Sequence, residues 1–375
     1  MLYHIINDDE VEHYKSIFLN IVSYSQAQHF FIVVANLDKT DSVRQFFQRN
    51  SIENYYIIDG RKNKKVPFLM KFLFRCRRNN LQKKEWELLG LICEIRKEPI
   101  ILHGIYYSAL APFVFLGYIK NISWVCWNWR TMLCGRWGSI KWLHYMQKKL
   151  SLKQFRKIIC LMKPDADDIA AYINAPERVL QISYSSNNLR NLPTVSTLPV
   201  SCPIRILLGN NGYCMRHYLP VLRILDPIAD KVEICCILAY GCSSDEVTVF
   251  KRECRQMLRL NISFWEDMVS VEEYCKRSSR YDIYVCPSDI QSGLGSIYRA
   301  LMMGQRIFLR DFNYHWIKES GGEVQHINEL IACVENFRRL DGESMRKNRE
   351  VVMRIVDTSE KWEAFYQLID HKSIV

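Results

Sequence analysis

Small and polar residues follow two apolar segments in the second half of the chain. The sequence Gly-Asn-Asn-Gly, residues 209–212, comes directly after Ile204–Leu208. A second loop, Ser288–Ser296, carries Gly293 and Gly295 immediately before a helical pattern. Glycine lets a backbone approach a phosphate or a sugar closely, and the first N–H groups of a helix bind phosphate. We therefore predict a diphosphate cradle at Gly293–Ser296. A tight turn after the first strand and an ordinary N-cap before the helix are the alternatives.

Two further strand ends in the same half could contact a ligand. Tyr240-Gly241 follows the predicted strand Ile234–Ala239, and Arg310–Asn313 follows Arg306–Leu309. Ligands of parallel sheets bind beyond the carboxyl ends of the strands. The carboxylate of Asp311 could accept hydrogen bonds from ribose or sugar hydroxyls, although a structural loop fits this segment equally well.

Candidate proton acceptors lie in the first half. His4, Asp8, Asp9 and His13 surround the first strand-to-helix turn, and His103 ends another strand. A transfer to a hydroxyl group needs a general base, and histidine or aspartate can serve. We predict His103, His13 and Asp9 as catalytic candidates. The alternative for each histidine is a packing role.

The sequence offers no metal-ligand pattern. Its 14 cysteines form no Cys-x-x-Cys pair, no Asp-x-Asp stands at a strand end, and no His/Cys cluster has ligand spacing. We therefore expect reduced cysteines and a metal-independent reaction without a cofactor. Helix dipole and hydrogen-bond donors would then neutralise a departing diphosphate.

These residues require strands and helices in alternation. Apolar strand candidates occur throughout, with helical stretches such as 86–96, 218–225, 246–258, 271–278, 296–303 and 342–368 between or after them. Continuous apolar strands separated by helices predict an α/β fold with parallel sheets covered on both faces. The strand candidates are residues 2–6, 30–35, 55–58, 100–102, 124–127, 158–161, 179–182, 204–208, 234–239, 261–265, 282–286 and 306–309.

A composition shift divides the pattern. Residues 183–203 are rich in Ser, Asn, Thr and Pro, which is typical of a linker. We predict a Rossmann-like domain over 1–190 on the acceptor side, a linker over 191–203, a nucleotide-sugar-binding Rossmann-like domain over 204–341, and a C-terminal helix over 342–375. Two such domains would face each other across a cleft.

The chain is basic, with a net charge of +11. Such a balance suits nucleic acid, anionic lipid or phosphorylated small molecules. The segment 136–157 mixes Lys and Arg with aromatic residues, which predicts contact with an anionic membrane surface, and a solvated face is the alternative. Residues 99–119 contain no charged side chain, but His103, Gly104 and Pro112 interrupt them. We expect a strand, a turn and a buried helix there instead of a membrane span, and no signal peptide.

Several of these segments resemble the bacterial TDP-N-acetylfucosamine:lipid II N-acetylfucosaminyltransferase family, which has the GT-B fold. The similar segments are Ile206–Gly212, Leu238–Gly241, Gln291–Ser296, Leu301–Gln305, Phe312–Trp316, and in the first half His4, His13 and Leu102-His103-Gly104. The similarity is strongest from Ile204 to Trp316. One departure is Trp127-Asn128-Trp129-Arg130, where the family pattern leads us to expect Trp-Gly-x-Asp.

The resemblance implies a hexosyltransferase that moves a 4-acetamido-4,6-dideoxyhexose from a dTDP-sugar to a polyprenyl-diphosphate-linked saccharide. Such an enzyme would act at the cytoplasmic face of the inner membrane as a peripheral protein, in enterobacterial common antigen or O-antigen synthesis. It also implies a role for Gln291, so that the expected donor contacts are Gly209, Asn210, Asn211, Gly212, Tyr240, Gly241, Gln291, Gly293, Gly295, Ser296 and Asp311.

Two other functions are compatible with the sequence. A sugar-nucleotide epimerase of GT-B build would need further carboxylates near the ligand. A nucleic-acid-binding protein would need a basic stripe with groove-reading or stacking elements, and no such module is recognisable. We therefore expect no nucleic-acid partner.

Overall fold

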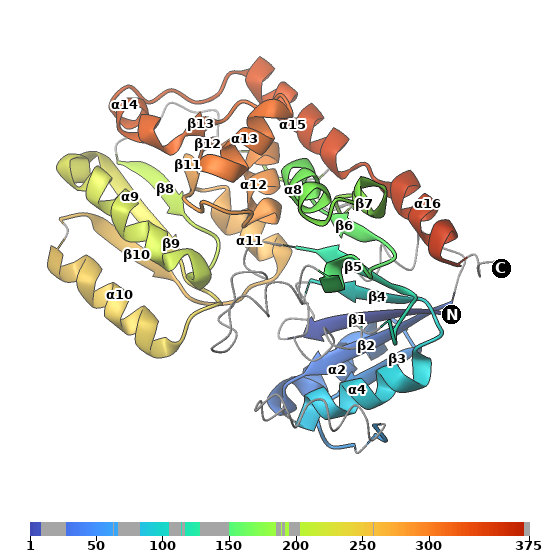
Figure 1. Cartoon of the computed structure of the whole chain (residues 1–375). Helices are drawn as coiled ribbons and strands as arrows, with labels where there is room; N and C mark the ends of the chain where they lie inside the picture. Colours follow the sequence, from blue (N-terminus) through green and yellow to red (C-terminus); the bar gives the residue numbers. More distant parts are fainter. Residues whose placement is uncertain are drawn as a thin grey trace. The chain divides into compact units, whose positions relative to one another are not determined.

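The computed structural model shows an α/β chain that divides into two compact units (Figure 1). Unit 1 comprises residues 1–185 and 358–375, and unit 2 comprises residues 186–357. The structure describes residues 1–8, 28–62, 64–66, 83–104, 114, 117–127, 150–184, 189, 192–194, 203–257 and 259–370.

Unit 1 contains a seven-stranded parallel sheet in the order β3-β2-β1-β4-β5-β6-β7. Its strands are β1 (Leu2–Asp8), β2 (His29–Ala35), β3 (Tyr55–Ile58), β4 (Ile100–His103), β5 (Ile122–Cys126), β6 (Ile158–Cys160) and β7 (Val179–Gln181). Its helices are η1 (Leu37–Lys39), α2 (Thr40–Arg49), α4 (Lys83–Ile95), α8 (Lys163–Ile173), η2 (Pro176–Arg178) and α16 (Ser359–Asp370).

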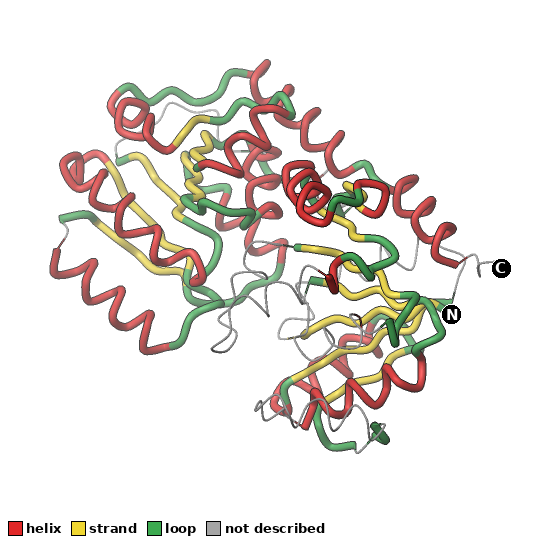
Figure 2. Tube along the Cα trace, in the orientation of Figure 1, coloured by secondary structure: helices red, strands yellow, loops and turns green. Residues whose placement is uncertain are grey.

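Helices cover both faces of this sheet, as Figure 2 lets the reader follow. Alternate strand residues such as Ile5 and Leu102 pack with α4 and α8 in one apolar cluster. Their neighbours, such as Ile6 and Ile101, pack with α2 and α16 in another. Because side chains alternate between the faces of a strand, a sheet buried on both sides needs continuous apolar runs.

Unit 2 contains a six-stranded parallel sheet in the order β10-β9-β8-β11-β12-β13. Its strands are β8 (Ile204–Leu208), β9 (Val232–Ile237), β10 (Asn261–Trp265), β11 (Ile283–Cys286), β12 (Arg306–Leu309) and β13 (Gln325–His326). Its helices are η4 (Gly212–His217), α9 (Tyr218–Leu225), η5 (Asp226–Lys231), α10 (Ser244–Met257), α11 (Val271–Ser278), α12 (Leu294–Met303), α13 (Asp311–Glu319), η6 (Ile327–Glu329), α14 (Leu330–Glu335) and α15 (Gly342–Val356).

One apolar cluster joins β8, β9 and β11 to α9, α10 and α14. The helix α12 packs on β11 and β12, and α15 packs on α12. Each unit is therefore doubly wound, and the predicted α/β class with two Rossmann-like sheets is confirmed.

Two predictions about elements need correction. The stretch 342–368, expected as one helix, forms α15 in unit 2 and α16 in unit 1. The break lies at Asp357, whose ψ of 82° is not helical, and at Thr358, whose hydroxyl donates to the carbonyl of Ser183 over 2.7 Å. Residues 311–313, for which a structural loop was one of two alternatives, are the first residues of α13, and Arg310 is its N-cap. In the part of the chain that is described, no helix has the length and apolar character that crossing a membrane requires.

Candidate functional site

The strand order of unit 2 defines a topological switch point between β8 and β11. Strands β9 and β10 continue the sheet on one side, and β12 and β13 continue it on the other. The loops after β8 and β11 therefore leave the sheet in opposite directions, which opens a crevice at their carboxyl ends where ligands of such sheets bind. The predicted segments 209–212 and 288–296 lie here, and the second of them continues into the first turn of α12.

Side chains and backbone tie the two loops together. The backbone N–H of Gly209 donates to the carbonyl of Val285 over 2.7 Å. The amide of Asn210 lies 3.4 Å from the hydroxyl oxygen of Ser292. The amide of Asn313, which is fully buried, donates to the carbonyl of Ser292 over 3.1 Å. Hydrogen bonds within unit 2 thus hold the two loops together.

The local structure requires glycine at some positions of these loops and not at others. Gly209 has a φ of +80°, and a Cβ there would lie 1.8 Å from the Tyr218 hydroxyl oxygen. Gly293 has a φ of +67°, and its Cβ would lie 2.8 Å from the Cγ of Asn210. Both positions require glycine for conformation and space. Gly295 has a φ outside the left-handed region and meets only the Arg299 side chain.

The loop after β9 joins the same edge. The backbone N–H of Gly212 donates to the carbonyl of Tyr240 over 2.6 Å, and the amide of Asn211 lies 3.4 Å from the Tyr240 hydroxyl. Gly241 has a φ of +88°. Ser296, in the first turn of α12, interacts with the hydroxyl of Tyr274, whose pKa burial raises to about 12.

Asp311 shows backbone strain at the end of β12. It is the first residue of α13 and has a φ of +40°, which is uncommon for a residue with a side chain. Its carboxylate lies 3.3 Å from the Nε of Arg310. Nearby groups of unit 2 include His217, which lies 3.4 Å from the carboxylate of Asp289. Burial is the main cause that lowers the pKa of His217.

The structure therefore gathers the expected donor contacts on the loops at one edge of the unit 2 sheet. Gln291 is 7% exposed and lies in the loop after β11. Sequence reasoning missed Arg299, and the signal was its spacing of four residues from Gly295, which places both on one face of α12.

In unit 1, three imidazole rings form a buried chain. The Nε2 of His4 lies 2.8 Å from the Nδ1 of His29, and the Nδ1 of His4 lies 3.1 Å from the Nε2 of His103. The Nδ1 of His103 lies 2.9 Å from the hydroxyl of Tyr184, to which the indole of Trp127 donates over 3.0 Å. The order β2-β1-β4 brings the three histidines together.

The Trp127 indole constrains the direction of the hydrogen bonds along this row of imidazole rings. An indole N–H can only donate, so the Tyr184 oxygen accepts its hydrogen bond, and the phenol proton is available to the Nδ1 of His103. With the phenol as donor to His103, the consistent set of tautomers has each neutral ring accepting at Nδ1 and donating at Nε2, from His103 to His4 and from His4 to His29. Burial lowers the pKa of His103 to about 3 and holds that of His4 well below its usual range. Burial also raises the pKa of Tyr184.

Of the three predicted catalytic candidates, the structure describes His103. His103 is 1% exposed and both of its ring nitrogens have hydrogen-bond partners, whereas Tyr184 is half-buried. Asp9 and His13 lie outside the described residues. Within the described ranges, no group of three or more His, Cys, Asp or Glu side chains could hold a metal ion.

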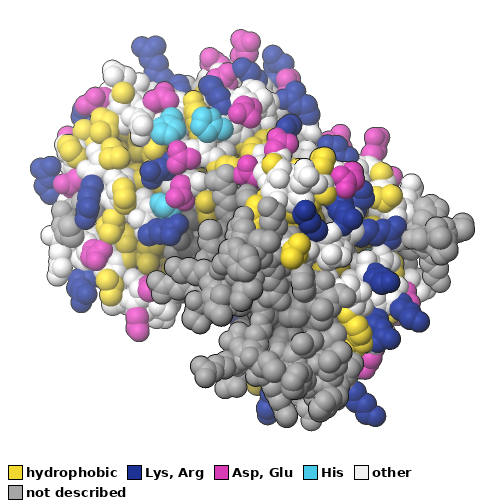
Figure 3. All heavy atoms as spheres, in the orientation of Figure 1, with side chains coloured by type: hydrophobic (Ala, Val, Ile, Leu, Met, Phe, Trp, Pro, Cys, Tyr) yellow, Lys and Arg dark blue, Asp and Glu magenta, His cyan; other side chains and the backbone are white. Residues whose placement is uncertain are grey.

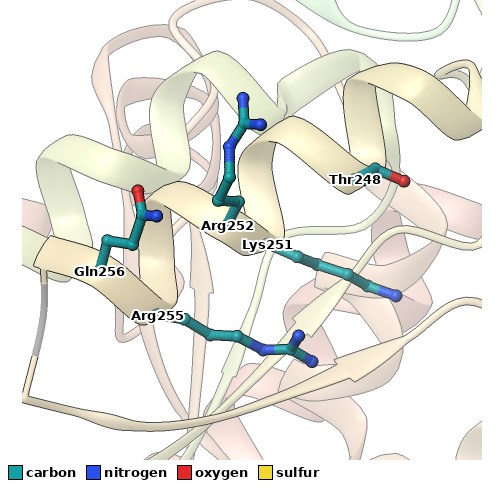
Figure 4. A pocket seen from close by; sticks show the side chains of 5 residues that line it. All are labelled: Thr248, Lys251, Arg252, Arg255 and Gln256. Atoms are coloured by element: carbon teal, nitrogen blue, oxygen red, sulfur yellow. The ribbon is translucent and has the colours of Figure 1, made fainter.

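A separate pocket of about 300 Å³ lies on α10 (Figure 4). It is lined by Thr248, Lys251, Arg252, Arg255 and Gln256. These residues lie from the middle to the end of α10, which runs away from the carboxyl edge of the sheet, so the pocket is separate from the crevice. Figure 3 shows Lys and Arg side chains interspersed with Asp and Glu over the described part of the drawn face.

Solved structures share this fold over nearly the whole chain. The Anabaena protein HepE, in complex with UDP and glucose, has a TM-score of 0.69 at 10% identity, and 99% of each chain is covered. Sucrose-phosphate synthase from Thermosynechococcus elongatus has a TM-score of 0.67 at 12% identity, with 99% of each chain covered. The UDP-GlcNAc 2-epimerase of Neisseria meningitidis has a TM-score of 0.58 at 9% identity, with 99% of this chain and 100% of that chain covered.

No protein-family model matches the sequence, and no curated protein matches it. The similarity is therefore one of structure. From its two doubly wound parallel sheets and these neighbours, the chain has the GT-B fold of glycosyltransferases.

Proposed function

We propose that the protein is a glycosyltransferase that binds a nucleotide-sugar donor at the switch point of unit 2. The observation that carries this proposal is the pair of loops after β8 and β11, joined through Asn210 and Ser292 and ending at the first turn of α12. Backbone N–H groups at a helix start carry partial positive charge and bind phosphate without a metal. Neighbours of the same fold, such as HepE in complex with UDP, support this assignment.

The sequence resemblance refines the proposal. It favours a dTDP-linked 4-acetamido-4,6-dideoxyhexose as donor and a polyprenyl-diphosphate-linked saccharide as acceptor, at the anionic inner-membrane surface. In the reaction, an acceptor hydroxyl oxygen forms a bond to the anomeric carbon, and the bond from that carbon to the phosphate oxygen breaks. The nucleoside diphosphate leaves, and the hydroxyl proton passes to a base.

His103 stays our predicted proton acceptor. Because its ring is 1% exposed and bonded to Tyr184, it would reach an acceptor hydroxyl only through the Tyr184 oxygen. The hydroxyl becomes strongly acidic as its oxygen bonds to the sugar, so an imidazole with a low pKa can receive the proton at that stage and release it afterwards.

A thermal-shift screen tests the donor class. A ligand that binds only the folded state raises the melting temperature, so dTDP and dTDP-sugars should raise it more than UDP, GDP or ADP. Gly295→Val is the matched variant, because Gly295 has an ordinary φ and only the end of a flexible side chain beside it. It should fold and lose the shift. If the variant folds and the nucleotides raise its melting temperature as much as that of the unchanged protein, the predicted diphosphate cradle is refuted.

The epimerase is a second candidate, favoured by the Neisseria neighbour. Incubation with a nucleotide sugar distinguishes the two functions. An epimerase inverts the sugar of the donor without an acceptor, whereas a transferase leaves the donor sugar unchanged until an acceptor is added.

A further inference from the structure

The glycine at position 295 is not explained by the fold. It lies in the first turn of α12, is exposed, and has a φ outside the left-handed region. Its added Cβ would meet only the guanidinium of Arg299, at 3.1 Å. The missing side chain leaves open the space between the first amides of the helix and Arg299.

Arg299 extends its charge toward that space. It lies four residues after Gly295 on the same face of α12, and long side chains on a helix lean toward its N-terminus. Arg299 is half-buried. Among the described residues, no carboxylate lies within ion-pair distance of its guanidinium.

The Arg299 guanidinium lies near two aromatic rings that pack against each other. The Cζ of Arg299 lies 5.8 Å from the ring centroid of Tyr274 on α11. The Tyr274 ring packs against Trp265, with centroids 5.4 Å apart, and the Cζ of Arg277 lies 5.4 Å from the Trp265 ring centroid. A cation over an aromatic face is attracted by the ring quadrupole, so this stack favours one orientation of Arg299.

We propose that Arg299 binds the diphosphate of the donor and that Tyr274 is its positioning residue. The inference rests on the proposed function. It adds a positively charged side chain to the uncharged backbone amides at the start of α12. A planar guanidinium can donate two parallel hydrogen bonds to phosphate oxygens. Arg299 and the helix start would together offset the charge that develops on the leaving diphosphate.

Calorimetric titration with nucleotides tests this role, with dTDP and UDP compared against dTMP and UMP. Hydrogen bonds to charged groups contribute about 1.5–3 kcal/mol, so Arg299→Met should weaken diphosphate binding about ten- to a hundredfold. Monophosphate binding should weaken less, and Arg299→Lys should restore part of the loss. The matched control is Arg255→Met, which removes the same charge from the exposed face of α10.

Tyr274 is tested by a pair of variants. Tyr274→Phe keeps the ring and removes only the hydroxyl that interacts with Ser296, so it should weaken dTDP binding less than the loss of the whole ring does. Tyr274→Leu removes the ring and should weaken dTDP binding, with a smaller effect once Arg299 is already replaced by Met. Equal losses in the Phe and Leu variants would overturn the positioning role.

Each failure has a distinct pattern. If the unchanged protein binds neither dTDP nor UDP, the proposed function fails. If it binds them and Arg299→Met binds equally well, the proposed function stands and this inference is overturned. If Arg299→Met and Arg255→Met lose the same affinity, the effect is one of net charge and Arg299 has no specific role. Melting curves without ligand confirm that each variant is folded.

Discussion

Lowering the pH from 8 to 5 should destabilise unit 1 through the buried ring of His103. Burial lowers the pKa of this imidazole from 6.5 to about 3. Below pH 6.5 the unfolded chain therefore binds a proton that the folded chain excludes. Stability that is fully present above pH 6.5 is lost progressively as the pH falls toward 3.

The size of this effect follows from the two pKa values. For one group it is about 1 kcal/mol at pH 6 and about 2 kcal/mol at pH 5, and it grows by about 1.4 kcal/mol for each further pH unit. His4 shares the direction, because burial and the neighbouring rings of His103 and His29 lower its pKa. The sum exceeds the contribution of His103 alone.

Urea titrations at several pH values measure this loss, with tryptophan fluorescence as the signal. The indoles of Trp86, Trp124, Trp127 and Trp362 lie in unit 1. Because other groups also titrate, the informative quantity is the difference between the unchanged protein and His103→Gln, whose amide N–H can still donate toward His4. The unchanged protein should lose about 2 kcal/mol more between pH 8 and pH 5. If the free energies of unfolding of the two proteins fall equally between pH 8 and pH 5, the assignment of His103 as a buried, neutral imidazole is refuted.

Three shorter predictions concern the same elements. Gly209→Ala should lower the free energy of unfolding of unit 2 by about 2 kcal/mol or more, because it forces a φ of +80° on alanine and a clash with a buried hydroxyl. Gly342→Ala, with open space around it, should leave the free energy of unfolding unchanged, and urea titration would show the difference. Trp362→Ala should cost unit 1 about 3–5 kcal/mol, because this indole is 1% exposed, and Leu368→Ala, at 43% exposure, should cost little in the same assay. Long-range proton–nitrogen NMR should find His103 protonated on Nε2, and protonation on Nδ1 would contradict the direction of the chain.

The strands were predictable because both sheets are buried on two faces. Each predicted strand overlaps an observed one, from β1 to β12, since a continuous apolar run is what such a strand requires. The strand β13 was missed because its two residues show no pattern. Helices α2 and α8 were missed because charged residues fill their solvent faces and mask the apolar positions.

The loops of the candidate site were predictable, and the contacts between them were not. Glycines directly after a strand are visible in the sequence, so residues 209–212 and 288–296 could be named. Their meeting at a switch point depends on the strand order, which sequence patterns leave open. The chain of His4, His29 and His103 depends on the same information, because 25 and 99 residues separate its members.

The same strand order places different chemistry at the switch points of the two units. In unit 2 the loops offer glycine, asparagine and helix amides, which do not titrate near neutral pH. In unit 1 the strand β4 ends in His103, whose ring is neutral and linked to Tyr184.

Affinity for a nucleoside diphosphate, if it depends on Arg299 and the amides of α12, should therefore change little between pH 6.5 and pH 8. A catalytic rate that changes over that range while donor affinity stays constant would place the titrating group in unit 1 or on the acceptor. A parallel change in donor affinity would instead indicate a titrating group beside the diphosphate, for which His217, next to Asp289 in the loop after β11, is a candidate.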